Sequence, residues 1–216
     1  MRWPSWRVRA WSKRCTGGAG SSDSASDRAS TSLNGVHDVA WARELARELL
    51  EEPLPRRWRH SIGVAAKAES VSSVVGQDAD VLVCSAWLHD IGYSPDLAVT
   101  GFHPLDGARY LRDVVGAGEL LCRLVAHHSC ACIEAGNRGL GEELAAEFAP
   151  VEGILTDALT FADMTTSPDG APVEVDTRLA EIFARYGDGH LVAESMKEAR
   201  PRIEQAERAV RAALAG

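Results

Sequence analysis

The sequence predicts an all-α domain, and three observations support this fold class. Apolar residues recur every three or four positions through most of the chain, which is the period of a helix with one buried face. The strict alternation of a half-buried strand is almost absent. Proline and glycine interrupt the pattern at intervals typical of helices. With 216 residues and 45% hydrophobic content, the chain is long enough and apolar enough for one domain with a core.

Two helices are expected in the first part of the folded region. Asp38 can cap a helix that runs to about Glu52, where Pro53 and Pro55 stop it. The next helix is expected from about Pro55 to Val75.

The third helix is expected to be central. Asp80 can cap it, and residues 81–91 are apolar nearly all round, which is typical of a helix buried on every side. Gly92 suits the left-handed position that closes a helix. A loop over 93–102 then leads to His103-Pro104, a pair typical of a first helical turn.

The remaining chain continues as helices. Glycines at three positions between 133 and 150 favour a loop before a short helix. Pro168-Asp169-Gly170 is a turn signal. Further helices are expected at about 119–128, 151–166, 175–186 and 191–213.

Residues 1–36 differ from the rest. The stretch 21–32 nearly lacks large apolar side chains and cannot bury enough surface to offset the entropy of ordering. Residues 1–36 are therefore expected to be a disordered or over-extended N-terminal segment, and the folded domain is expected over 37–216. Three tryptophans among arginines in this segment also fit a membrane or nucleic-acid arm, a weaker interpretation.

Charge and cysteine content narrow the function classes. The segment 1–36 carries six basic and two acidic residues, a charge of +4, so the remaining residues carry −12 and the net charge is −8. An acidic body argues against nucleic acid as a ligand. No apolar run is long enough to span a bilayer, and no export signal is visible. Five cysteines without paired spacing favour a reduced, cytoplasmic setting.

Histidines and aspartates form a candidate metal site. Adjacent His and Asp side chains can hold one metal through nitrogen and oxygen, and buried imidazoles and carboxylates are costly unless paired or metal-bound. On a helix the two histidines of the pair 127–128 point about 100° apart, so at least one is expected to face the site, and both are kept as candidates. The candidate ligands are His60, His89, Asp90, His103, His127, His128 and Asp163.

This donor set predicts one or two divalent transition metals. His60, His89, Asp90 and Asp163 form a first group, and Asp90 could bridge to a second metal held by the other histidines. Mixed nitrogen and oxygen donors suit Mn, Fe, Ni, Co or Zn. Two such metals would polarise a phosphoryl group and activate a water.

Three further residues are candidates for supporting roles. Lys67, two turns after His60, and Arg109 could bind a substrate phosphate, although solvated side chains are the simpler interpretation. Asp106 could orient His103 as a hydrogen-bond acceptor, or could merely favour the positive start of its helix.

The order His60, His89-Asp90, Asp163 resembles the H…HD…D signature of the HD superfamily of metal-dependent phosphohydrolases, over about residues 56–167. This resemblance implies a helical bundle with the metal site between central helices, and hydrolysis of phosphoester or phosphoanhydride bonds in nucleotides. His103 and the pair 127–128 resemble the extra histidines of the superfamily's two-metal branches. The chain lacks the Gly-Tyr-Pro loop of one such branch, and Tyr93 stands where those families often have lysine.

The expected function is therefore a phosphohydrolase with Asp90 at its catalytic centre, acting on a small phosphorylated substrate of which a nucleotide is the expected type. Two alternatives remain: a di-iron oxygenase of HD type, and a non-catalytic sensor that binds a nucleotide. The arginine-rich last helix could support an oligomer, although a solvated packing helix is the simpler interpretation.

Overall fold

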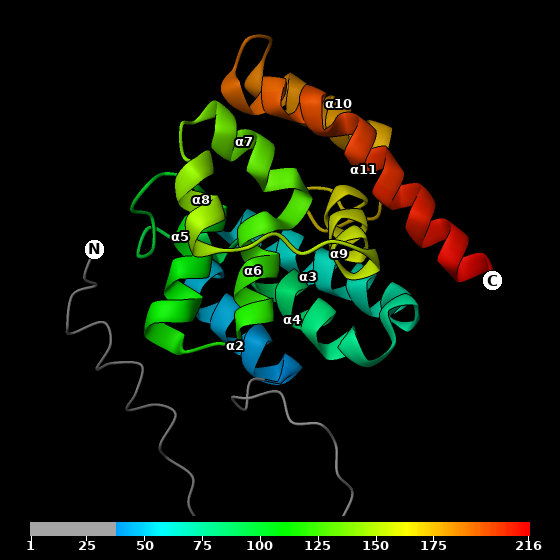
Figure 1. Cartoon of the computed structure of the whole chain (residues 1–216), viewed down its shortest axis with the longest axis horizontal. Helices are drawn as coiled ribbons and strands as arrows, with labels where there is room; N and C mark the ends of the chain where they lie inside the picture. Colours follow the sequence, from blue (N-terminus) through cyan, green and yellow to red (C-terminus); the bar gives the residue numbers. More distant parts are fainter. Residues whose placement is uncertain (1–37) are drawn as a thin grey trace, which may run out of the picture.

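The computed structural model describes residues 38–216, and this part of the chain is a helical bundle without a named strand (Figure 1). The prediction of an all-α fold is confirmed. The predicted N-terminal segment, 1–36, lies outside the described residues. An isolated antiparallel bridge joins Thr166 to Pro172.

The elements follow one another with short connections. The N-terminal half comprises α2 (Val39–Leu50), α3 (Pro55–Val71), η1 (Ser72–Asp78), α4 (Ala79–Leu88), η2 (Ile91–Tyr93), α5 (His103–Tyr110) and η3 (Leu111–Val115). The C-terminal half comprises α6 (Glu119–His127), η4 (His128–Cys130), α7 (Ala131–Asn137), α8 (Gly141–Glu147), α9 (Ile154–Met164), α10 (Val175–Tyr186) and α11 (Leu191–Ala215).

Helix α4 is the centre of the bundle. Every residue from Val81 to Leu88 is buried, and the helix packs against α2, α3, α6 and α9. The apolar run of the sequence thus has the central position that was predicted for it. The start of the helix differs slightly from the prediction. Asp78 precedes the first helical residue, and Asp80 lies in the first turn, where its negative charge interacts favourably with the helix dipole instead of capping the helix.

Local signals explain several boundaries. Asp38 caps α2 as predicted, because its carboxylate accepts a hydrogen bond of 2.8 Å from the Trp41 amide. The expected loop after residue 133 is wrong, since α7 and α8 occupy most of that stretch. Gly139, with φ at +74°, makes the turn between these two helices, and Gly136 is accommodated within α7.

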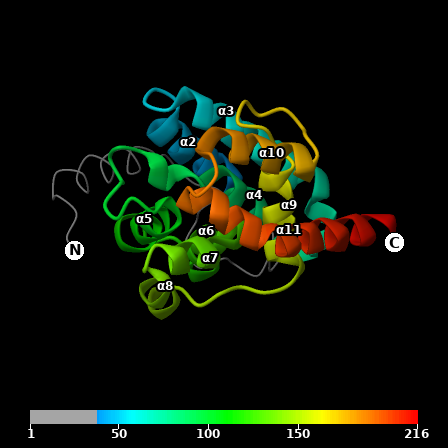
Figure 2. The ribbon, with the colours of Figure 1, turned by 90° about the horizontal axis from the view of Figure 1, so that it is seen from above.

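The last two helices form a cover with its own apolar cluster. Met164 at the end of α9 joins residues of α10 and α11 in this second core, and α11 also packs along α9 and α7. Figure 2 shows α10 and α11 lying over α9 on one side of the bundle.

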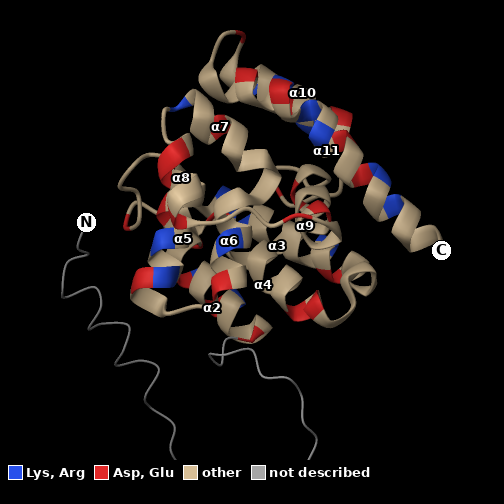
Figure 3. Ribbon diagram, viewed as in Figure 1, with Lys and Arg blue, Asp and Glu red and all other residues tan. Residues whose placement is uncertain are grey.

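Acidic and basic residues are interspersed along α10 and α11 (Figure 3). They pair at helical spacing, for example Arg200 with Glu204 and Arg211 with Glu207. Among residues 38–216 there is no helix of the length and apolar character that crossing a bilayer requires.

Candidate metal centre

Buried histidine and aspartate side chains from five elements meet inside the bundle. α3 brings His60, the end of α4 brings His89 and Asp90, α5 begins with His103, η4 begins with His128, and α9 carries Asp163. All but His103 are less than 9% exposed, and the His103 side chain is 14% exposed. So many polar groups would be costly to bury without a shared partner.

These six residues fall into two groups of three, and each group could hold one metal ion. The first group is His60, His89 and Asp163, and the second is Asp90, His103 and His128; within each, the ligand atoms lie within 4.8 Å of one another. In the first group Nε2 of His60 is 2.9 Å from Oδ1 of Asp163. In the second, the Nε2 atoms of His103 and His128 are 3.1 Å apart.

Asp90 connects the two groups. Its Oδ2 lies 3.4 Å from Nε2 of His89 and 3.9 Å from Nε2 of His60. Its Oδ1 lies 3.4 Å from Nε2 of His103. Each carboxylate oxygen of Asp90 therefore faces a different group, as a bridging ligand requires.

The histidine orientations fit a metal. Nδ1 of His60, His89 and His128 donates to the backbone carbonyl of Ser167 at 2.9 Å, Ala86 at 2.7 Å and Val125 at 2.7 Å, respectively. A carbonyl only accepts, so Nδ1 is the donor in each contact and Nε2 is the ring atom that faces the centre. Nε2 of His89 is fully buried without any hydrogen-bond partner. A buried ring nitrogen without a partner is the kind of atom that a bound metal would satisfy.

The structure separates the two adjacent histidines. Helix α6 ends between them, and the next two residues, Ser129 and Cys130, both have positive φ, at 48° and 62°. His128 turns into the second group, whereas Nε2 of His127 donates to the Phe148 carbonyl at 2.7 Å. His127 is therefore not brought to the centre and acts as a link to the segment after α8.

The strained turn after α6 serves the first group. The Ser129 hydroxyl donates to Oδ2 of Asp163, whose other oxygen faces His60. Positive φ at a non-glycine residue costs roughly 1–3 kcal/mol. Here that cost is coupled to holding a candidate ligand carboxylate in place.

A close backbone contact fixes His103. A Cβ on Gly92 would lie 2.0 Å from the His103 carbonyl oxygen and 2.7 Å from the Gly107 amide nitrogen. Gly92 does not adopt the positive φ predicted for it. It is needed because η2 and the start of α5 pack backbone against backbone.

The centre is arranged to keep its carboxylates ionised. Burial opposes ionisation of Asp90, but the charges of Arg57 and His89 outweigh it and hold the pKa of that carboxyl well below its usual range. Burial also opposes ionisation of Asp163, whose pKa is nonetheless depressed by the His60 hydrogen bond and the His89 charge.

The pKa values of the buried histidines are shifted in opposite directions. Burial alone would favour neutral His89, yet the charge of Asp90 raises its pKa to about 9. Burial lowers the pKa of His103 and of His128, so both rings are neutral and able to donate a lone pair.

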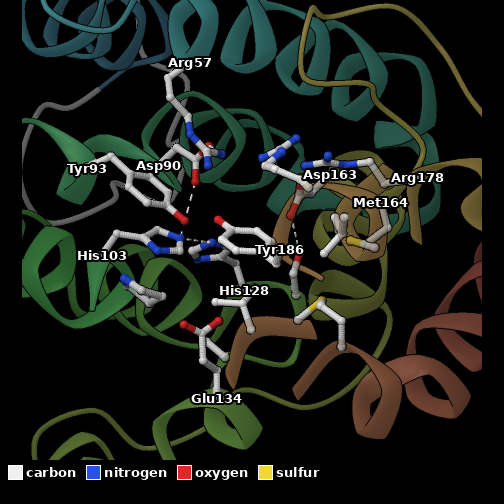
Figure 4. Close-up of a pocket in the computed structure, with 17 residues that line it drawn as sticks. Arg57, Asp90, Tyr93, His103, His128, Glu134, Asp163, Met164, Arg178 and Tyr186 are labelled. Atoms are coloured by element: carbon white, nitrogen blue, oxygen red, sulfur yellow. Dashed lines mark hydrogen bonds and ion pairs between the residues drawn. The ribbon is translucent and has the colours of Figure 1, made fainter. Parts of the chain in front are cut away.

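A cavity of about 80 Å³ opens onto the centre, and Asp90, His103, His128 and Asp163 form part of its wall. Figure 4 shows Arg57 beside Asp90, and Arg178 beside Asp163 and Met164. Nη1 of Arg57 donates to Oδ2 of Asp90 at 2.7 Å.

Arg57 belongs to a stack of planar groups. Its guanidinium lies 4.0 Å from the Tyr93 ring centroid, and Tyr93 stacks on His103 with 3.9 Å between ring centroids. The tyrosine thus supports a cation on one face and a candidate ligand on the other.

The three predicted supporting residues lie elsewhere. Lys67 sits 5.9 Å from the Phe161 ring, and Arg109 pairs with Glu143 and Glu147 at α8. Neither lines the cavity, so the structure does not bring them to the centre.

Asp106 lies in the first turn of α5, as the second of its two interpretations expects. Its carboxylate accepts hydrogen bonds from the amides of Val99, Thr100 and Gly101 and from the Thr100 hydroxyl, at 3.0–3.2 Å. It therefore orders the loop before α5 rather than orienting the His103 ring.

Sequence reasoning missed three residues of the site. Arg57 was one of several arginines around residue 57, and nothing in the local pattern distinguished it. Ser129 follows the predicted histidine pair directly, and that adjacency was a usable signal. Arg178 comes from α10, whose position over the cavity depends on tertiary packing and left no trace in local sequence.

The family model for the HD domain matches residues 57–164, half of the chain, and the chain belongs to this family. The match contains every residue of the two groups. HD domains bind divalent metals, and the family consists mainly of metal-dependent phosphohydrolases. No curated protein and no solved structure matches the chain.

Proposed function

We propose that this protein is a metal-dependent phosphohydrolase that cleaves a phosphoester or phosphoanhydride bond of a small substrate, with a nucleotide as the expected type. The observation that carries the proposal is the position of Asp90. It belongs to the second donor group, faces the first, and lines a cavity whose wall also contains arginine side chains. Complete donor groups support an enzyme over a non-catalytic sensor.

The donor set suits one or two ions among Mn, Fe, Ni, Co and Zn. Bound there, a divalent metal supplies the Lewis acidity that activates a water and neutralises charge on a phosphoryl group. His60, His89 and Asp163 would hold one ion, His103 and His128 the other, and Asp90 both.

The chain's own residues supply orientation and charge. Ser129 and His60 fix the two oxygens of Asp163, and the backbone carbonyls behind the histidines fix their rings. Arg57 supplies a permanent positive charge at the cavity wall, positioned by Asp90 and Tyr93. A guanidinium there can donate to anionic phosphate oxygens.

The cavity dimensions favour a small reacting group. At about 80 Å³ it is well below the roughly 300–1,000 Å³ of sites that enclose a whole ligand. A phosphoryl group enters, while the rest of the substrate stays at the mouth. This supports a mononucleotide or another small phosphate ester over a cyclic dinucleotide.

The test pairs metal analysis with a phosphate-release screen. Metal content is measured by mass spectrometry after loading with each candidate ion, and phosphate release is screened over nucleotides and small phosphate esters. Asp90→Asn should lose the activity and at least half of the bound metal, with a helical circular dichroism signal like that of the native protein. Asp188→Asn, at an exposed position, is the matched control.

Two outcomes would refute the proposal. Full activity in Asp90→Asn would remove the bridging carboxylate from the mechanism. Oxygen uptake by the iron-loaded protein, together with no phosphate release from any substrate, would establish the oxygenase alternative instead.

A further inference from the structure

Arg178 places a second guanidinium in the cavity wall. It lies on α10, fourteen residues beyond the last residue of the HD match. Residues on the same cavity wall from α10 and α11 include Ile182, Arg185, Tyr186 and Met196. The cavity is therefore completed by helices outside the family's common segment.

Arg178 is unusual for an arginine because it is almost completely buried, with only 6% of its side chain exposed. Nη1 donates to Oε2 of Glu181 at 2.6 Å, whereas Nε has no hydrogen-bond partner. A buried guanidinium with an unused N–H is costly unless a further acceptor completes it.

Arg185 shows the contrast within the same wall. Its Nε and Nη2 both donate to Oε1 of Glu181, so its hydrogen-bonding edge is occupied. Glu181 thus holds Arg185 by a paired contact and Arg178 by Nη1 alone. Arg178 therefore lines the cavity with hydrogen-bonding capacity that Glu181 does not use.

We propose that Arg178 binds the non-bridging phosphate oxygens of the substrate, so that α10 supplies substrate recognition to a metal centre built by the HD segment. This inference rests on the proposed function. Arg57 next to Asp90 and Arg178 next to Asp163 then contribute positive charge from two sides of the same cavity (Figure 4).

The charge at this position fits the assignment. A phosphate ester brings up to two negative charges into a cavity whose wall already contains two carboxylates, Asp90 and Asp163. A guanidinium beside the phosphate adds attraction to that of the metals. The forked guanidinium can contact two oxygens of one phosphate, which gives orientation as well as attraction.

The experiment uses the full-length, metal-loaded protein and compares Arg178→Gln with the native chain. Binding of inorganic phosphate is measured by calorimetry, and KM and kcat are measured with an aryl phosphate monoester. A charge-assisted hydrogen bond is worth about 1.5–3 kcal/mol, so phosphate affinity should fall roughly 10- to 100-fold. KM should rise in parallel, while metal content stays at the native level.

Two variants sharpen the result. Arg178→Lys keeps the charge but not the fork, and should restore part of the phosphate affinity. Arg200→Gln removes an arginine paired with Asp176 on the outer surface and should leave every measurement unchanged. Should Arg178→Gln fail to fold, Arg178→Met, whose apolar chain suits a buried position, takes its place in the comparison.

Native phosphate affinity and KM in the Arg178 variant would overturn the inference and leave the proposed function standing. Loss of bound metal would also overturn it, since Arg178 would then serve only to support Asp163. Conversely, phosphate binding that depends on Arg178, in a protein that hydrolyses no phosphate ester, would support the inference and refute the proposed function.

Discussion

Gly92→Ala should displace the second ligand group although none of its ligand residues is replaced. The new Cβ would lie 2.0 Å from the His103 carbonyl oxygen, whereas ordinary contacts begin at 3.4 Å. The start of α5 must therefore move by about 1.4 Å, and His103 moves with it. Overpacking of this kind costs roughly 3 kcal/mol.

The loss of stability and the loss of bound metal can each be measured. For a domain of this size, roughly 3 kcal/mol corresponds to a fall of about 6–12 °C in melting temperature. Metal content should fall toward one ion per chain, because the group that contains His103 is displaced and the first group is not. Calorimetric melting and mass spectrometry of the metal-loaded protein check these values.

A matched glycine gives the control. Gly136 lies within α7, and a Cβ there would meet nothing within 4 Å. Gly136→Ala should leave metal content unchanged and stabilise the helix by roughly 0.5–1 kcal/mol. A Gly92→Ala protein with native melting temperature and full metal content would refute the reasoning about this contact.

The remaining predictions concern individual side chains. His128→Ala should lower metal content, while His127→Ala should leave it near native and reduce stability by roughly 1–3 kcal/mol, since it frees a buried carbonyl; equal metal loss in both would contradict this. Asp106→Asn should make residues 97–102 more accessible to limited proteolysis, because four donors then share one accepting oxygen where the carboxylate offers two; an unchanged digestion pattern would argue against that role. Hydrogen bonds from Arg109 and Arg112 lower the pKa of Glu147, so its stabilising effect is present above pH 4.5 and disappears as pH falls through the lowered value. The stability difference between native protein and Glu147→Gln, followed by urea unfolding, should shrink in that acidic range, and a difference independent of pH would be inconsistent with this assignment.

The sequence was a good guide to the helices because their signals are local. The apolar run of α4 required burial on all sides, and the carboxylate of Asp38 could find an amide only a few residues away. The ligand order was also accessible, since histidine and aspartate side chains buried on successive helices are costly without a shared partner.

The choice between His127 and His128 was not accessible in the same way. It depends on where α6 ends and on two positive φ angles at Ser129 and Cys130, which are residues without a glycine's preference for that region. Side-chain direction at a helix end is decided by the contacts of the following turn, here the Ser129 hydrogen bond to Asp163.

The arginines of the cavity could not be identified from the sequence, because their positions depend on tertiary packing. Arg57 is identified only by the approach of α3 to the end of α4, and Arg178 only by the way α10 lies over α9. Lys67 and Arg109 were equally plausible on the linear chain, yet their partners proved to be Phe161 and the glutamates of α8.

The hydrogen bonds from Nδ1 to backbone carbonyls restrict proton transfer through the histidine rings of the centre. Nδ1 of His60, His89 and His128 is occupied by a backbone oxygen, so none of these imidazoles can pass a proton through to the opposite side. Under the proposed function, a proton released at the centre would therefore leave through the same cavity that admits the substrate. The substrate and the released proton would then use the same cavity, and a tightly bound product would block both.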